Sequence, residues 1–491
     1  MSMNEAKPLS QIQAELDAGT YTCRDLVQHY LDQIRQTEAD IQSFLDLYED
    51  DALTQADKVD QKREQGQQIG PLEGIPIGIK DNIVIKDRRC TCASKILSEF
   101  VSPYSATVIE KLTQAGMIMI GKLNMDEFAM GSSTENSAFQ KTRNPWDLQR
   151  VPGGSSGGSA SAVAAGQVPV SLGSDTGGSI RQPASYCGVV GVKPTYGRVS
   201  RYGLVAFASS LDQIGPLSRY VEDSAAILDV ISGQDRHDAT SSAQPPLSLR
   251  SQLKSNIKGL KIAVPEELFG DTIDDKIKAQ VKAALDVYTA EGATWSLVNM
   301  DAFKMAISTY YIIAPAEASS NLARYDGVRY TSRADNCKSL TEMYVKTRGE
   351  GFGDEVKRRI LLGTYVLSSG YYDAYYLKAQ KVRTLIKQAY DRVFKDADLV
   401  LSPTVPTTAF KIGEKVDDPL AMYASDLATI PANMAGLPAI SLPCGQVDGL
   451  PVGMQLTAPA FEEQRMMDAA YGFQLLSDHH LAQPKMALAK G

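Results

Sequence analysis

Two serine–glycine clusters are the residues of this sequence best suited to covalent chemistry. They are GGSSG at 153–157, which contains Ser155, and TGGS at 176–179, which ends on Ser179. Glycine beside serine leaves backbone N–H groups open to a bound group, because no Cβ shields them. A serine hydroxyl is a weak nucleophile until a neighbouring group takes its proton. The two clusters indicate either a reaction centre or a linker of unusually small residues.

A linker does not account for this segment. Flexible Gly/Ser linkers lack apolar order, whereas residues 156–165 follow the pattern of a small-residue helix and residues 168–172 alternate as a strand. Ser179 comes soon after that strand, and open α/β sheets place their sites at the carboxyl ends of strands. We therefore interpret the segment as part of a reaction centre.

Two other serine and glycine motifs fit the segment less well. Residues 153–157 match the G-x-S-x-G nucleophile elbow, but residues 147–152 before them make a poor strand and only three histidines follow. Residues 153–158 have the glycine spacing of a phosphate-binding loop, but Ser159 stands where that loop needs a lysine. Neither motif supplies a complete site.

The base for such a serine is expected to be a lysine. The chain has four histidines, and Lys80 directly follows the apolar alternation of residues 75–79. Only about one lysine in a thousand is neutral at pH 7 at its ordinary pKa of about 10.4, but burial disfavours the charged form. A second serine hydroxyl, which both donates and accepts, can relay the proton to that lysine.

Alternating strand and helix patterns position these residues within one α/β unit, residues 1–491. Residues 1–66 are predicted to form a helical layer, with capping boxes at Ser10 and Thr22. Residues 72–230 form the core, and residues 301–395 are mostly helical. Predicted strands lie at 75–79, 117–120, 168–172, 189–192, 203–208, 261–264, 399–401, 439–442 and 452–456.

Composition excludes several other classes of function. A net charge of −8 argues against a nucleic-acid platform, because binding to phosphates needs basic patches. Six thinly spaced cysteines predict reduced thiols and no metal site. The first residues resemble no secretion signal, and no stretch approaches the roughly 20 apolar residues of a membrane span. We expect a cytoplasmic protein.

The serine clusters and Lys80 together resemble the amidase signature family. The similarity covers GGSSGGS at 153–159 and GSDTGGSIRQP at 173–183. It implies a central mixed β-sheet covered on both faces by helices in a single large domain. It also implies a catalytic triad in which Ser179 is the nucleophile, Ser155 the bridging serine and Lys80 the base.

The same resemblance implies details of the backbone around the serines. The peptide bond between Gly154 and Ser155 is expected to be cis. Backbone N–H groups are expected to form the oxyanion hole, and they belong to Thr176, Gly177, Gly178 and Ser179.

Within the family, the flanking sequence is similar to the tRNA-dependent amidotransferases over roughly residues 9–480. The resemblance implies a glutaminase that forms an acyl-serine and works with two partners, designated B and C in such enzymes. The first receives the ammonia, uses ATP and Mg²⁺ and holds most of the tRNA, and the second, which is small, helps to join the other two. No cofactor is expected in this chain. The stretches that carry this resemblance are 72–81, 125–136, 193–203, 310–326, 355–363 and 399–406.

Three further residues are implied to bind glutamine. Arg359 would pair with the α-carboxylate and Asp426 with the α-amine, with Tyr310 alongside. Two alternatives stay open on sequence grounds. One is a stand-alone amidase that acts on other carboxamides, and the other is a scaffold protein without catalytic activity.

Overall fold

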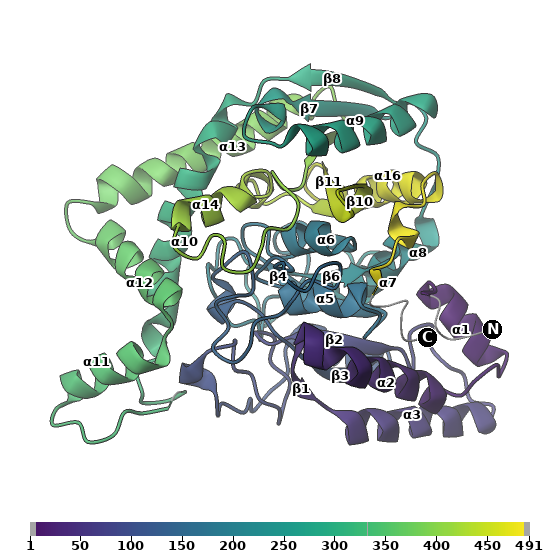
Figure 1. The fold of residues 1–491 in the computed structure, drawn as a ribbon, viewed down its shortest axis with the longest axis horizontal. Helices are drawn as coiled ribbons and strands as arrows, with labels where there is room; N and C mark the ends of the chain where they lie inside the picture. The colour runs from purple at the N-terminus through teal and green to yellow at the C-terminus, as the bar shows by residue number, and fades with distance from the viewer. Residues whose placement is uncertain (1–5, 331, 486–491) are drawn as a thin grey trace.

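Over residues 6–330 and 332–485, which the computed structural model describes, eleven strands form one sheet (Figure 1). The strand order is β1-β3-β2-β4-β6-β5-β10-β11-β9-β7-β8. The bounds are β1 (Phe44–Leu47), β2 (Pro76–Lys80), β3 (Ile118–Leu123), β4 (Val170–Asp175), β5 (Val190–Lys193), β6 (Gln213–Ser218), β7 (Lys261–Pro265), β8 (Thr294–Val298), β9 (Leu399–Pro403), β10 (Ala439–Val447) and β11 (Leu450–Thr457).

The sheet is mixed and flanked by helices, as expected. Strand β2 runs parallel to β3 and β4, and β7 runs parallel to β8 and β9, while the other pairs are antiparallel. Helices α5 (Gly157–Ala164) and α6 (Arg181–Cys187) contact β4 and β10 respectively, and α7 (Val221–Ile231) and α16 (Glu463–Leu475) contact β6 and β10.

The N-terminal layer differs in two details from the all-helical prediction. Helices α1 (Leu9–Asp17), α2 (Cys23–Ile41) and α3 (Glu49–Glu64) form it, but the short strand β1 lies between α2 and α3 and pairs with β3. The capping box at Thr22 is present. The one at Ser10 is absent, because α1 starts earlier and the Ser10 hydroxyl donates to Glu222 at 3.0 Å instead.

Two other strand predictions need correction. Residues 203–208 do not join the sheet as a strand, because the N–H groups of Phe207 and Ala208 donate to the Asp212 carboxylate in a turn. Strand β6, which was not predicted, follows this turn and lies between β4 and β5 in the sheet. Strand β8 was not predicted; it lies at the sheet edge with Trp295 and Leu297 exposed.

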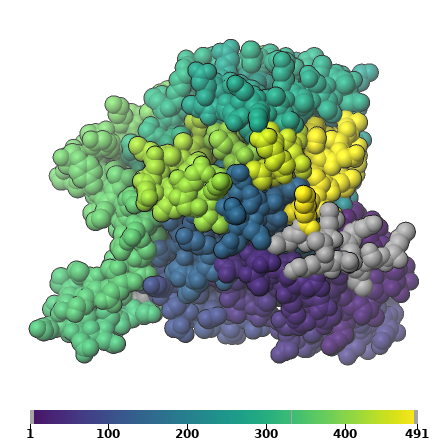
Figure 2. Space-filling model, in the orientation of Figure 1, coloured from purple at the N-terminus to yellow at the C-terminus, as the bar shows by residue number. Residues whose placement is uncertain are grey.

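The segment 301–395 is mostly helical, as predicted, and part of it projects from the rest of the molecule. Helices α11 and α12 extend to one side of the ribbon, and the space-filling view shows the same projection (Figures 1 and 2). The bounds of the helices not given above are α4 (Thr107–Gln114), α8 (Leu249–Gln252), α9 (Asp275–Ala290), α10 (Ala306–Asn321), α11 (Leu340–Gly351), α12 (Asp354–Leu367), α13 (Lys378–Val393), α14 (Pro419–Tyr423) and α15 (Ile430–Met434).

The parallel pair β2 and β4 brings the two halves of the site together. Ile79 lies opposite Leu172, so the carboxyl ends of both strands reach the same edge of the sheet. Lys80 is the last residue of β2, and the glycine-rich turn with Ser179 follows β4. Within the described ranges, no helix is long and apolar enough to cross a membrane.

Candidate active site

Lys80 lies at the centre of a buried group of serines. Its Nζ donates to the hydroxyl oxygens of Ser155 and Ser156, each at 2.8 Å, and of Ser174 at 3.0 Å. Asn82 also donates to the Ser174 hydroxyl, at 2.9 Å. Three hydroxyls of fixed position therefore surround one amine.

The environment of Lys80 favours its neutral form. The side chain is fully buried, and the loss of solvation lowers its pKa to about 7. The negative charges of Asp126, Asp175 and Asp212 act in the opposite direction but are outweighed. At neutral pH a large fraction of Lys80 can therefore accept a proton.

The peptide bond between Gly154 and Ser155 is cis, as the resemblance implied. The Gly154 N–H donates to Gln182 Oε1 at 2.9 Å, and the Ser155 carbonyl accepts from the Asp126 N–H at 3.2 Å. A Cβ on Gly154 would overlap the Asp126 carboxylate, so this position requires glycine. These contacts hold the Ser155 hydroxyl beside Lys80.

Ser179 lies next to this group but is not hydrogen-bonded to it through its side chain. Its carbonyl accepts from the Ser156 N–H at 3.1 Å, which ties the two serine segments together. The Ser179 hydroxyl makes no hydrogen bond with any residue that the structure describes, and the residue is 8% exposed. The contact between Lys80 and Ser155 is thus present, whereas a direct bond between Ser155 and Ser179 is not.

Asp175 fixes the backbone on both sides of the Ser179 position. Its carboxylate accepts from the Gly178 N–H at 2.9 Å and from the Ile180 N–H at 3.2 Å. Arg181 pairs with the same carboxylate at 3.0 Å, and both side chains are fully buried. Burial disfavours the ionised form of Asp175, but Arg181 outweighs it and lowers the pKa to about 2. The loop is therefore held by a permanent negative charge.

This bond changes the expected set of oxyanion donors. Gly178 was predicted to offer an open N–H to the oxyanion. In the structure this N–H donates to the Asp175 carboxylate, which holds the turn, so it is not free to bind a substrate oxygen. The N–H groups of Thr176, Gly177 and Ser179 donate to no other described residue. The Gly177 carbonyl accepts from Thr429 Oγ1 at 2.7 Å, which orients the loop.

Tyr310 and Asp426, two of the predicted glutamine-binding residues, lie beside this loop. The Tyr310 ring packs on Gly177 so closely that a Cβ there would be 2.8 Å from Tyr310 Cζ. Asp426 accepts from the Ser132 hydroxyl at 2.6 Å, and its carbonyl accepts from Thr429 Oγ1 at 3.1 Å. Burial raises the pKa of Asp426 to about 7, against the bond from Ser132 and the charge of Arg359.

Arg359, the third predicted residue, is buried on α12 and is already paired. Its Nε donates to Glu355 Oε1 at 2.7 Å. Its guanidinium carbon lies 5.3, 5.4 and 5.6 Å from the ring centres of Tyr311, Tyr423 and Phe207. The charge of Arg359 also favours the ionised forms of Tyr310 and Asp426. Arg359 is thus close enough to act on both.

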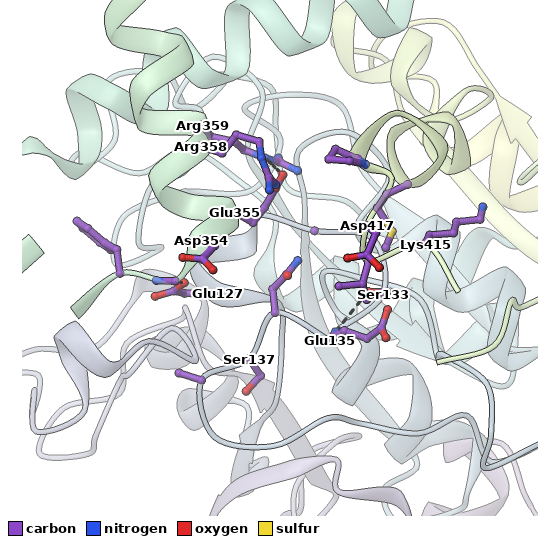
Figure 3. Close-up of a pocket in the computed structure, with 18 of the residues that line it drawn as sticks. Glu127, Ser133, Glu135, Ser137, Asp354, Glu355, Arg358, Arg359, Lys415 and Asp417 are labelled. Atoms are coloured by element: carbon purple, nitrogen blue, oxygen red, sulfur yellow. Dashed lines mark hydrogen bonds and ion pairs between the residues drawn. The ribbon is translucent and has the colours of Figure 1, made fainter. Parts of the chain in front are cut away.

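A charged cavity of about 540 Å³ adjoins these residues (Figure 3). Arg359 lines it, together with Ser133, which follows the Ser132 that bonds to Asp426. Lys80 and the other predicted site residues do not line it. Its charged lining residues are Lys95, Glu127, Glu135, Glu350, Asp354, Glu355, Arg358, Arg359, Lys415 and Asp417.

Sequence reasoning missed several residues of the site. Ser156 and Ser174 lie inside the serine-rich segment, so their types were visible but their contacts with Lys80 were not. Asp126 and Glu355 lie outside that segment, in two of the stretches that carry the resemblance, but nothing in the sequence indicated their contacts at the site. Across the described part of the chain, no group of three or more His, Cys, Asp or Glu residues is arranged to hold a metal ion.

Comparisons with known proteins agree on one family. The model of the amidase family matches residues 25–467. The A subunit of the glutamyl-tRNA(Gln) amidotransferase of Geobacillus thermodenitrificans is 58% identical over 476 residues, 97% of this chain and 98% of that protein. The similarity therefore extends over nearly the full length of both.

Solved structures give the same result. The crystal structure of the A subunit of glutamyl-tRNA(Gln) amidotransferase from Thermotoga maritima superposes with a TM-score of 0.77 at 46% identity, covering 91% of each chain. A bacterial aryl acylamidase of the amidase signature family superposes with a TM-score of 0.86 at 24% identity, covering all of both chains. At that identity the second likeness shows the fold alone.

Proposed function

The chain belongs to the amidase family, and from this premise we propose that it is the glutaminase component of a tRNA-dependent amidotransferase. It would hydrolyse glutamine and supply ammonia for converting Glu-tRNA(Gln), or Asp-tRNA(Asn), to the amidated form. The observation that carries the proposal is the buried Lys80–Ser155 pair beside Ser179. The 58% identity to the A subunit of a glutamyl-tRNA(Gln) amidotransferase supports the choice of reaction within the family.

In the proposed acylation step, the Ser179 hydroxyl oxygen attacks the side-chain amide carbon of glutamine. Ser155 accepts the proton of Ser179 and gives its own to Lys80, whose lowered pKa of about 7 makes it a base at neutral pH. The missing Ser155–Ser179 hydrogen bond is consistent with a contact that forms only when substrate is bound.

The tetrahedral intermediate needs hydrogen-bond donors for its oxyanion. We assign this role to the open N–H groups of Thr176, Gly177 and Ser179, which the Asp175 contacts hold in place. Collapse of the intermediate breaks the C–N bond, and the leaving nitrogen takes a proton back from Lys80 through Ser155. Water then attacks the acyl-serine by the reverse route and releases glutamate.

The amino-acid end of glutamine would meet charges of opposite sign. Arg359 pairs with the α-carboxylate and Asp426 with the α-ammonium, while Tyr310 closes the pocket over Gly177. Such a pair favours a zwitterionic amide over a neutral one.

The two partners, B and C, remain part of the proposal. The first, the amidating partner, would use ATP and Mg²⁺ to activate the aminoacyl-tRNA and would receive the ammonia. The second, the small linking partner, would help to join the amidating partner to this chain. The chain itself would need no cofactor. A cytoplasmic location follows from its tRNA-linked role.

The experiment that tests the function is a glutaminase assay on the complex of this chain with both partners. Glutamate release should rise when ATP and the aminoacylated tRNA are added, because ammonia use is coupled to its supply. Ser179→Ala should abolish release. A chain that hydrolyses apolar amides as well as glutamine, and that ignores partners and tRNA, would contradict the proposal.

A further inference from the structure

Only one of the three guanidinium nitrogens of Arg359 is hydrogen-bonded to a described residue. Its Nε donates to Glu355 Oε1, while Nη1 and Nη2 donate to no residue in the described ranges. The residue is only 3% exposed, but neither nitrogen is among the buried side-chain atoms that lack a partner, so both keep contact with solvent, and Arg359 lines the charged cavity. A ligand with two acceptor oxygens would satisfy both in the fork geometry of arginine.

Glu355 is itself fixed by two other groups. Its Oε1 also accepts from the Tyr423 hydroxyl at 2.9 Å, and its second oxygen accepts from Arg358 (Figure 3). Burial disfavours the charged form of Glu355, but the charge and hydrogen bond of Arg359 and the bond from Tyr423 outweigh it and lower the pKa. Glu355 is therefore a carboxylate that aligns Arg359.

Aromatic rings restrict the remaining motion of Arg359. Tyr423 stacks on Tyr311 with ring centres 3.7 Å apart, and the guanidinium contacts both rings and Phe207. Cation–π contacts of this kind hold the guanidinium in place without using its N–H donors. The ion pair with Glu355 and the aromatic rings therefore hold Arg359 while leaving Nη1 and Nη2 free to donate hydrogen bonds to a ligand.

We propose that Glu355 and Tyr423 are positioning residues that aim the terminal nitrogens of Arg359 at the α-carboxylate of the substrate, and so set the preference of the site for an α-amino acid amide. This inference rests on the proposed function, because it takes Arg359 as the carboxylate ligand. It adds that α12 and α14, which carry Glu355 and Tyr423, jointly determine specificity.

The test compares two substrates of the intact complex: glutamine, and 4-aminobutanamide, which lacks the α-carboxylate. Glu355→Ala should raise KM for glutamine roughly tenfold or more, with little change in kcat, since hydrogen bonds to charged groups are strong. The kcat/KM for 4-aminobutanamide should not change. Glu355→Gln, which keeps an acceptor but loses the charge, should give an intermediate effect.

Two further variants test whether the effects come from misfolding or from a general change at the surface of α12. Tyr423→Phe removes only a hydroxyl and should lower the preference for glutamine several-fold while the melting temperature stays within a few degrees. Lys357→Ala is the matched control on α12, where it breaks an exposed pair with Asp354, and should leave both substrates unaffected.

The outcomes separate this inference from the proposed function. If Arg359→Ala weakens glutamine use but Glu355→Ala and Tyr423→Phe do not, or if both substrates lose equally, the positioning role is wrong and the function stands. If Arg359→Ala leaves glutamine use unchanged, Arg359 is not the carboxylate ligand and the proposed glutamine site fails.

Discussion

At the scale of single residues, Lys80 combines full burial with three serine hydroxyls in hydrogen-bond contact. An amine in water would stay protonated at neutral pH and would be useless as a base. Burial at the end of β2 lowers its pKa to about 7, so its place in the sheet favours the neutral form that a base requires.

This pKa gives a prediction for the pH dependence of kcat. Lys80 must be neutral to accept the Ser179 proton, so kcat should fall about tenfold per pH unit below pH 7 and level off above it. Steady-state rates at saturating glutamine between pH 5 and 9 measure this. Lys80→Arg, which stays charged, should lose activity at every pH. A flat profile from pH 5 to 8 would be incompatible with a lysine base.

Asp426 should affect KM rather than kcat. Burial raises its pKa to about 7, so below that pH it binds a proton and loses its attraction for the substrate ammonium. KM for glutamine should therefore rise as the pH falls below 7. Asp426→Asn should have a high KM at all pH values. A wild-type KM in that variant would remove Asp426 from the substrate site.

At the scale of elements, the turn between β4 and α6 depends on one carboxylate. Asp175 accepts N–H groups from both sides of Ser179 and pairs with the buried Arg181. The turn is therefore ordered before substrate arrives, which leaves the N–H groups of Thr176 and Gly177 in fixed positions.

Breaking this buried pair should destabilise the chain as well as inactivate it. Asp175→Asn leaves the Arg181 charge uncompensated, and such losses cost about 3–5 kcal/mol of the free energy of unfolding. Urea unfolding of the purified chain measures the change. Asp147→Asn, which breaks the partly exposed pair with Arg150, is the control and should change it by less than about 1 kcal/mol. Equal losses of unfolding free energy in the two variants would contradict the proposed role of the Asp175–Arg181 pair in stabilising the turn.

Local signals predicted the elements whose causes are local. The Thr22 cap, helix α5 and strand β2 were all visible as spacing and residue type. The signal failed where a distant partner decides the outcome. Ser10 bonds to Glu222 instead of capping α1, and Asp212 draws residues 207–208 into a turn.

The sequence pointed to the serines and the lysine that the structure brings together, but not to the residues that support them. The serine clusters and Lys80 stand out in the sequence, because small residues and an apolar strand are local features. Asp126 and Glu355 do not, since their roles come from contacts made across the fold. The Gly178 N–H could not be predicted either, because its hydrogen bond to Asp175 forms only in the folded turn.

At the scale of the whole molecule, the net charge of −8 predicts little direct contact with tRNA. The isolated chain should bind tRNA no more tightly than the roughly 10⁻⁴–10⁻⁶ M of non-specific binding at physiological salt, whereas the complex with the amidating partner should bind tightly. Fluorescence anisotropy with labelled tRNA distinguishes the two. Tight binding by this chain alone would move the tRNA site onto it.

The most direct test of the account is to identify the covalent intermediate. The complex is mixed with glutamine, quenched in acid during turnover, digested and analysed by mass spectrometry. We predict a γ-glutamyl ester on the peptide that carries Ser179, absent in Ser179→Ala. An adduct on any other residue, or turnover in the Ser179→Ala variant, would contradict the assignment of Ser179 as the nucleophile.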